Sequence, residues 1–283
     1  MPGAFFSTAT HTVSAESYSF LQTWIQRASG IVIDANKSYL LESRLGPIVE
    51  REHLGSIDTL CHSLRAGKPG LAQKVIEAMT THETLFFRDH APFEALRTSI
   101  LPALLRERPR GHKLTLWSAA ASSGQEAYSL AMMLLEMGLT PGEVSILATD
   151  LSEKVLERAR AGIYGNFEVS RGLPSTLQTR YFERHGEEWQ LRPNVRSMVR
   201  FDTLDLRNSL SGRGPFDVIF CRNVLIYFDA ETKRGILREL RSTLARGGHL
   251  FLGTAEAVSL SDGFRRVQTA DAISYIADEP HRP

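Results

Sequence analysis

The sequence predicts an α/β fold in which a doubly wound, Rossmann-like sheet follows an all-α N-terminal domain. Apolar residues recur with helical spacing over about the first 85 residues, and β-rich runs alternate with helical stretches from about residue 113 onward. A third observation is that residues 163–200 depart from this alternation. The length of 283 residues suits one large or two modest domains.

The N-terminal domain is predicted to contain four helices. The first begins at the N-cap Ser14 and ends at Gly30, and the second starts near Lys37. A third is predicted over 56–64 and a fourth from Leu71. We place this domain at 1–90. We expect 91–112 to be an exposed linker, because it ends in a basic run that contains proline and glycine.

The second domain, 113–283, is predicted to hold a parallel sheet. Its β-rich runs are 113–120, 144–150, 199–206, 216–224 and 249–257. Helices are expected over 125–136, 152–160 and 230–244. Alternation of strands and helices implies a doubly wound sheet. Within 163–200, a turn at His185, Gly186 and Glu187 predicts a hairpin, and hence a small antiparallel β-subdomain inserted into the sheet.

Composition excludes several classes of protein. The formal net charge is +1, which argues against a protein that mainly coats nucleic acid. Cys61 and Cys221 are far apart, so we expect a reducing, cytoplasmic location, with Cys221 an inert thiol inside a strand. The apolar runs are too short to span a bilayer, so we expect no membrane insertion. The histidines share no metal-ligand spacing, and we predict no metal.

The first strand-to-helix turn of the sheet is predicted to line a ligand site. From Ser118 to Gly124 every residue is small, which lets the backbone approach a ligand closely. The G-x-G-x-x-G pattern is absent, and Glu126 would repel a phosphate but would suit the ammonium group of S-adenosylmethionine (AdoMet). Asp150 could accept hydrogen bonds from ribose hydroxyls. Alternatively, Glu126 complements the helix dipole and Asp150 caps the next helix.

A second set of polar residues follows the buried strand that starts at Phe216. Arg222 and Asn223 stand at its carboxyl end, where side chains face the crevice of a doubly wound sheet. Tyr227 and Phe228 add an aromatic rim. The alternative is a strand followed by ordinary polar loop residues.

Four motifs in order along the chain resemble a known family. They are THETLFFRD at 81–89, LWSAAASSGQEAYSLA at 116–131, LATD at 147–150 and FDVIFCRNVLIYF at 216–228. The chain is similar to the CheR-type chemotaxis receptor glutamate methyltransferases over nearly its whole length. The resemblance implies that AdoMet donates a methyl group to glutamate side chains of chemoreceptor cytoplasmic domains. The products would be glutamyl methyl esters, which serve chemotactic adaptation, and S-adenosylhomocysteine.

The resemblance also implies site residues. Arg88 would orient the acceptor carboxylate, and Tyr227 would help to place the methyl group or the acceptor. His82 stands where many relatives have asparagine, and the pair Asp205 and Leu206 stands where Asn-Leu is common. The implied cofactor contacts are His82, Thr84, Arg88, Glu126, Asp150, Asp205, Leu206, Arg222 and Asn223.

Lys37, Arg44 and Arg51 are spaced by seven residues, which places them on one face of the second helix. They form either a solvated face or, as the resemblance implies, a basic stripe that recognises the acidic methylation helices of chemoreceptors. The predicted hairpin has a compact turn, whereas family members that bind a C-terminal receptor pentapeptide tend to have a longer loop. We therefore expect no strong pentapeptide tether. The oligomeric state is not predicted.

Two other functions share this fold and ligand. A nucleic-acid methyltransferase could use the basic stripe as a phosphate track, although an Asn/Asp-Pro-Pro-Tyr segment after the fourth strand is absent. A non-catalytic AdoMet-binding protein could serve as a receptor scaffold. Six implied site residues argue against that alternative: Arg88, Glu126, Asp150, Arg222, Asn223 and Tyr227.

Overall fold

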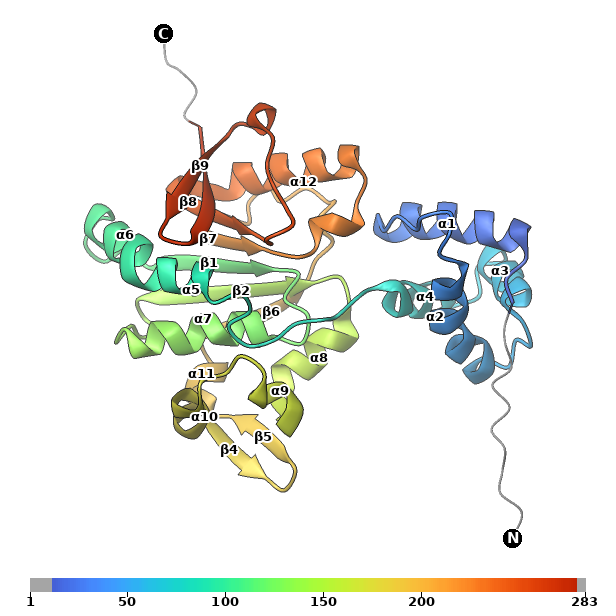
Figure 1. Cartoon of the computed structure of the whole chain (residues 1–283), viewed down its shortest axis with the longest axis horizontal. Coiled ribbons are helices and arrows are strands. Elements are labelled where there is room, and N and C mark those ends of the chain that lie inside the picture. Colours follow the sequence, from blue (N-terminus) through green and yellow to red (C-terminus); the bar gives the residue numbers. More distant parts are fainter. Residues whose placement is uncertain (1–11, 279–283) are drawn as a thin grey trace. The chain divides into compact units, whose positions relative to one another are not determined.

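The computed structural model describes residues 12–278. Contacts divide the chain into two units (Figure 1). The first unit contains the chain up to Thr81 together with Tyr227–Asp229, and the second contains His82–Ile226 and the chain from Ala230 onward. The boundary therefore falls between the first two residues of the segment THETLFFRD at 81–89, and thus earlier than residue 90, where the sequence suggested it.

The first unit is a bundle of four helices. They are α1 (Ala15–Ser29), α2 (Ser38–Arg51), α3 (Ile57–Arg65) and α4 (Leu71–Met79). Ser14 caps α1 by accepting a hydrogen bond from the backbone N–H of Ser17, and Gly30 ends the helix in the left-handed conformation. The apolar stripes of all four helices meet in one buried core, which includes Leu21, Leu45 and Leu60. The predicted helical domain is thus present.

The second unit is built on a seven-stranded mixed sheet of order β6-β2-β1-β7-β8-β10-β9. Its parallel part comprises β1 (Leu114–Ala119), β2 (Val144–Asp150), β6 (Val199–Thr203), β7 (Phe216–Cys221) and β8 (Leu244–Leu252). All six residues of β7 are buried, as expected of a central strand covered on both faces. The predicted α/β fold is confirmed.

Helices connect the parallel strands. They are α7 (Gln125–Glu136), α8 (Glu153–Ala161) and α12 (Ala230–Thr243), close to the predicted ranges. The side chain of Ser152 caps α8, and α7 and α8 pack against β1, β2 and β6. Tyr128 of α7 is buried and donates a hydrogen bond to the carbonyl of Ala159 in α8, which locks the two helices together.

The predicted insertion is a three-stranded antiparallel sheet of order β3-β5-β4. Its strands are β3 (Ile163–Gly165), β4 (Phe182–His185) and β5 (Glu188–Leu191), and short helices α9 (Asn166–Ser170), α10 (Ser175–Tyr181) and α11 (Pro193–Arg196) surround them. His185 pairs with Glu188 across a two-residue turn, and Gly186 adopts a positive φ of 63° there. The compact hairpin is confirmed.

The expected linker at 91–112 is wrong for most of its length. Residues 91–107 form helical structure: α5 (Ala91–Ala95), a π-helical turn η1 (Leu96–Ile100) and α6 (Leu101–Glu107). Phe93, Leu96 and Leu104 lie in the core of the second unit. Their helical spacing outweighs the proline and basic residues that suggested an exposed connection.

Two strands at the end of the chain were not predicted. Strand β10 (Ala272–Ala277) pairs antiparallel with both β8 and β9 (Phe264–Thr269), so this edge of the sheet is antiparallel. Two short 3₁₀ turns, η2 (Leu225–Tyr227) and η3 (Leu260–Asp262), complete the elements named in the structure. Within residues 12–278, every helix is too short or too polar to cross a membrane.

Candidate AdoMet site

The candidate site lies at the carboxyl edge of the parallel strands. Since β6, β2, β1, β7 and β8 run in the same direction, the residues that end or follow them gather along one edge of the sheet. Ser118, Asp150, Asp205 and Arg222 all stand at such ends. Ligands of doubly wound sheets bind at this edge.

A buried arginine organises the middle of the site. Arg222 follows β7, and its side chain is only 1% exposed. Its guanidinium donates hydrogen bonds to a Glu126 carboxylate oxygen at 3.0 Å and to Asp89 at 2.5 Å. The rings of Phe93 and Phe220 flank it at about 6 Å. Two carboxylates against one guanidinium leave a net negative charge, which favours a cationic ligand.

Glu126 is held in place by two donors. Ser118, at the end of β1, donates its hydroxyl to Oε1 of Glu126 at 2.8 Å, while Arg222 donates to Oε2. Glu126 stands in the first turn of α7, so it also complements the helix dipole. The two interpretations of Glu126 are therefore compatible in geometry, and its carboxylate is fixed before any ligand arrives.

The loop between β1 and α7 is strained and anchored by Asp150. Ala120 and Ser122 adopt positive φ angles of 66° and 52°, which are costly for residues with a side chain. Asp150 accepts hydrogen bonds from the backbone N–H groups of Ser122 at 2.9 Å and Ser152 at 3.0 Å. A carboxylate has about four acceptor positions, so two remain for a ligand such as a ribose.

Residues 82–90 pack across this loop within the second unit. The carbonyl of His82 accepts a hydrogen bond from Ser122, and the N–H of Phe87 donates to Ser129 of α7. Arg222 donates to the carbonyl of Arg88 at 3.0 Å. The segment is strained, with positive φ at Phe87, Asp89 and His90. The motif THETLFFRD is thus built into the carboxyl edge of the sheet.

The other predicted contacts in the second unit have varied surroundings. Arg88 is half-buried and donates to the carbonyl of Glu83, so its guanidinium braces its own segment. Asp205 forms an ion pair with Arg207 at 2.6 Å, and Leu206 beside it is buried. Thr84 is half-buried. Asn223 has a positive φ of 58°, a conformation that asparagine tolerates better than most residues.

The remaining predicted residues belong to the first unit. The carbonyl of Tyr227 accepts a hydrogen bond from the N–H of Val32. Lys37 precedes α2 and pairs with Asp34 at 2.7 Å. Arg44 donates to the carbonyls of Met79 and Thr80 at the end of α4.

The three cations therefore do not form one open stripe. Arg51 is exposed, and its Nε bonds only along its own helix, to the carbonyl of Pro47. Arg44 instead caps a neighbouring helix, a role that the spacing of the three residues did not reveal.

Two carboxylates at the site were missed. Asp89 directly follows Arg88 in the first motif and pairs with Arg222. Glu256 lies beyond the end of β8 and accepts hydrogen bonds from the backbone N–H groups of Asn223 and Gly253. A usable signal was present for both, since Asp89 ends the first motif and Glu256 lies near the end of the predicted β-rich run 249–257.

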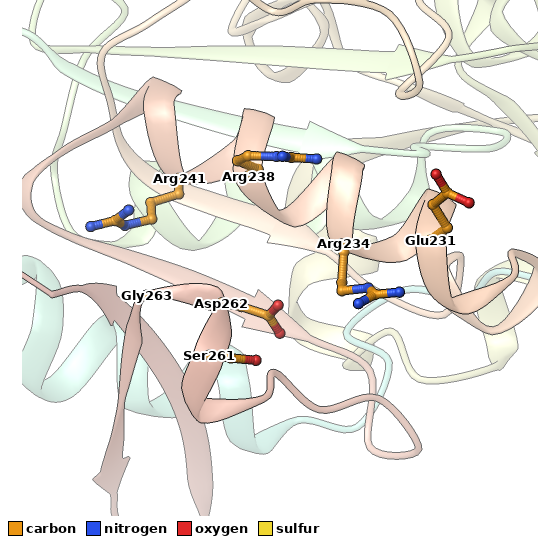
Figure 2. Close-up of a pocket in the computed structure, with 7 residues that line it drawn as sticks. All are labelled: Glu231, Arg234, Arg238, Arg241, Ser261, Asp262 and Gly263. Atoms are coloured by element: carbon orange, nitrogen blue, oxygen red, sulfur yellow. The ribbon is translucent and has the colours of Figure 1, made fainter.

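Two other features lie in the second unit. Burial raises the pKa of the Cys221 thiol well above its usual value, in keeping with an inert thiol. A groove of about 480 Å³ lies between α12 and the η3 turn (Figure 2). Its lining residues are Glu231, Arg234, Arg238, Arg241, Ser261, Asp262 and Gly263, so the groove is distinct from the predicted site.

Comparisons with known proteins identify the cofactor. Residues 82–273 match the family described as "CheR methyltransferase, SAM binding domain", and residues 16–80 match "CheR methyltransferase, all-alpha domain". The fold and the matched domains are those of an AdoMet-dependent methyltransferase. The chain belongs to the CheR methyltransferase family.

Relatives match this chain over almost its whole length. "Chemotaxis protein methyltransferase 1" of Pseudomonas aeruginosa is 42% identical over 267 residues, which cover 92% of this chain and 97% of the relative. "Chemotaxis protein methyltransferase Cher2" of Pseudomonas putida is 41% identical, covering 90% and 96%. A "Chemotaxis protein methyltransferase" of Vibrio parahaemolyticus is 41% identical, covering 93% and 98%.

Proposed function

We propose that this methyltransferase esterifies glutamate side chains on the cytoplasmic methylation helices of chemoreceptors, and that it works in the cytoplasm. The observation that carries the proposal is the match to proteins named chemotaxis protein methyltransferases over more than nine tenths of their length. Both domains of the family are included in that match.

The donor set at the carboxyl edge fits AdoMet. The net negative cluster of Arg222, Glu126 and Asp89 suits a ligand that carries ammonium and sulfonium cations. Asp150 retains acceptor capacity for ribose hydroxyls, next to a loop of small residues. We assign AdoMet contacts to these groups and to His82, Thr84, Arg88, Asp205, Leu206 and Asn223.

AdoMet, when bound, supplies an electrophilic methyl group on a sulfonium sulfur. The acceptor glutamate has an ordinary pKa of about 4.3, so at pH 7 its carboxylate is ionised and can act as the nucleophile without a general base. The protein has to align the two partners and exclude water. We assign Arg88 to orienting the acceptor carboxylate and Tyr227 to placing the methyl group or the acceptor.

The test is transfer of labelled methyl groups to bacterial membranes that contain chemoreceptors, followed by mild alkali. Methyl esters release volatile methanol, whereas methylated bases and amines retain the label. We expect volatile counts that are lost in Asp150→Ala. The control is Glu143→Gln, at the amino end of β2, and it should keep these counts.

Other outcomes would overturn the assignment. Non-volatile label in added nucleic acid would indicate a nucleic-acid methyltransferase. Normal AdoMet binding without transfer to any of a panel of chemoreceptors would indicate a scaffold protein.

A further inference from the structure

The loops that follow β7 and β8 are joined through one carboxylate, that of Glu256. Its Oε2 accepts hydrogen bonds from the backbone N–H of Asn223 at 2.8 Å and of Gly253 at 2.7 Å. Its Oε1 accepts one from the backbone N–H of Ile226 at 3.3 Å. Three backbone donors from two loops thus converge on one side chain.

This carboxylate acts on a residue with an uncommon backbone conformation. Asn223 has a φ of 58°, which is uncommon for a residue with a side chain although asparagine adopts it more readily than most. Hydrogen bonds from backbone N–H groups to an ionised acceptor are about twice as strong as neutral ones. Glu256 therefore supplies the interaction that holds Asn223 in its left-handed conformation.

Gly253 permits the same arrangement because it has no side chain. A Cβ atom at this position would lie 2.7 Å from Nδ2 of Asn223 and 2.7 Å from Oε2 of Glu256. Its φ lies outside the positive range that favours glycine, so the requirement is for space. The side-chain amide of Asn223 thus rests directly over a glycine, with Glu256 beside it.

We propose that Glu256 is a positioning residue for AdoMet: it fixes the loop after β7 so that Asn223 presents its side chain to the cofactor. This inference rests on the proposed assignment of Asn223 to the AdoMet site. Glu256 acts through the backbone of Asn223 and needs no contact with AdoMet itself. Its effect should therefore appear in cofactor affinity and disappear once Asn223 is removed.

The test measures the Kd of AdoMet and of S-adenosylhomocysteine by calorimetry, on the full-length chain. We expect Glu256→Ala to weaken AdoMet binding at least tenfold and to raise the KM for AdoMet, with little change in the KM for receptor. Asn223→Ala should weaken binding similarly. The double variant should be no weaker than Asn223→Ala alone, since residues that act as a unit are not additive.

A matched control separates positioning from general stability. Glu239, on α12, accepts a backbone hydrogen bond from Leu210 at 2.8 Å in the same unit and is not among the predicted site residues. Glu239→Ala should lower the unfolding midpoint and leave the Kd of AdoMet unchanged. If Glu256→Ala does not fold, Gly253→Ala tests the same arrangement, because its methyl group would displace the Asn223 amide.

The possible failures are distinguishable. Wild-type protein that does not bind AdoMet would overturn the proposed function. Wild-type binding that Asn223→Ala leaves unchanged would overturn the role of Asn223 and the present inference together. Weakened binding in Asn223→Ala with unchanged binding in both Glu256→Ala and Gly253→Ala would overturn the inference alone.

Discussion

The two ends of strand β7 each carry a buried charge, and the two charges are satisfied differently. Near its start, Asp217 is fully buried and accepts hydrogen bonds from Arg108, His112 and the backbone N–H of Thr115. After its end, Arg222 is buried between two carboxylates. The first cluster pairs one carboxylate with one arginine, whereas the second keeps a net negative charge.

The difference separates a structural cluster from the proposed ligand site at the two ends of one strand. Asp217 ties the end of α6 to the sheet, because Arg108 directly follows that helix. Its oxygens are occupied by protein donors. The acidic groups around Arg222 keep charge that a cationic ligand can neutralise. We therefore assign the paired Asp217 to stability and the net negative cluster around Arg222 to ligand binding.

The largest expected effect is on the stability that Asp217 provides. Asp217→Ala should lower the free energy of unfolding by about 3–5 kcal/mol, because it leaves a partly buried arginine without its carboxylate. Urea unfolding measures this loss. The folded fraction should bind AdoMet with unchanged Kd, and a Kd raised tenfold would break the proposed separation of the two ends.

The decrease in the free energy of unfolding at low pH gives a second measurement of the role of Asp217. Burial alone would raise the pKa of Asp217, but hydrogen bonds from Thr115 and His112 and the nearby Arg108 outweigh it and lower the pKa. The contribution is therefore fully present above the unfolded pKa of about 3.9 and is lost as pH falls through the lower folded pKa. Asp217→Asn should reduce the loss of unfolding free energy in this pH range.

His249 should make the stability of the protein sensitive to milder acid than Asp217 does. It lies opposite Val218 in the β7–β8 pair and bonds to Ser274. Burial, helped by the charge of Arg265, lowers the pKa of His249 to about 4. As pH falls from about 6.5 to about 4, the unfolded chain takes up the proton first, so stability should decline by at most roughly 3 kcal/mol.

The check is urea unfolding at several pH values between 4 and 7. His249→Gln should reduce the slope in this window, whereas Asp217→Asn should reduce the slope at lower pH. An unchanged slope in His249→Gln would contradict the assignment.

At the other end of β7, a change at Glu126 should affect binding more than stability. Glu126→Gln keeps the shape of the side chain but removes its charge, so AdoMet affinity should fall about tenfold, or about 1.4 kcal/mol. Calorimetry measures the Kd, and urea unfolding should show a smaller loss than for Asp217→Ala. If AdoMet bound equally well to the variant, the net negative charge would not be what recognises it.

Much of this architecture could be predicted from local sequence. The parallel strands, the helices after them and the hairpin at Gly186 follow from periodicity and turn residues. The helices at 91–107 were missed because a proline and a basic run hid the helical spacing of Phe93, Leu96 and Leu104. Strands β9 and β10 lie at the antiparallel edge, where the alternation of strands and helices no longer applies.

The partners within the site could be predicted only in part. The motifs allowed us to predict that Glu126, Asp150 and Arg222 lie at the carboxyl ends of the parallel strands, because the topology of the sheet places these ends together. Periodicity carries no information about which carboxylate meets which donor. The pairing of Arg222 with Asp89, and of Glu256 with Asn223, depends on loops that meet only after folding.

Helix α2 offers the same comparison on a smaller scale, between Arg44 and Arg51. Arg44 is taken up by backbone carbonyls at the end of α4, so Arg44→Ala should lower the stability of the protein by about 2 kcal/mol. Arg51 is exposed, and Arg51→Ala should change stability by less than about 0.5 kcal/mol.

The smallest expected effect is on the rate of receptor methylation, where Arg44→Ala and Arg51→Ala should also differ. Arg51→Ala should raise the KM for receptor by roughly threefold or less at low salt, as for other exposed charges, and the difference should shrink as salt is added. Arg44→Ala should affect the rate only through loss of folded protein. A receptor KM that rises above the wild-type value at low salt, and less so at high salt, in Arg44→Ala but not in Arg51→Ala would show that the paired arginine is the one that meets the receptor.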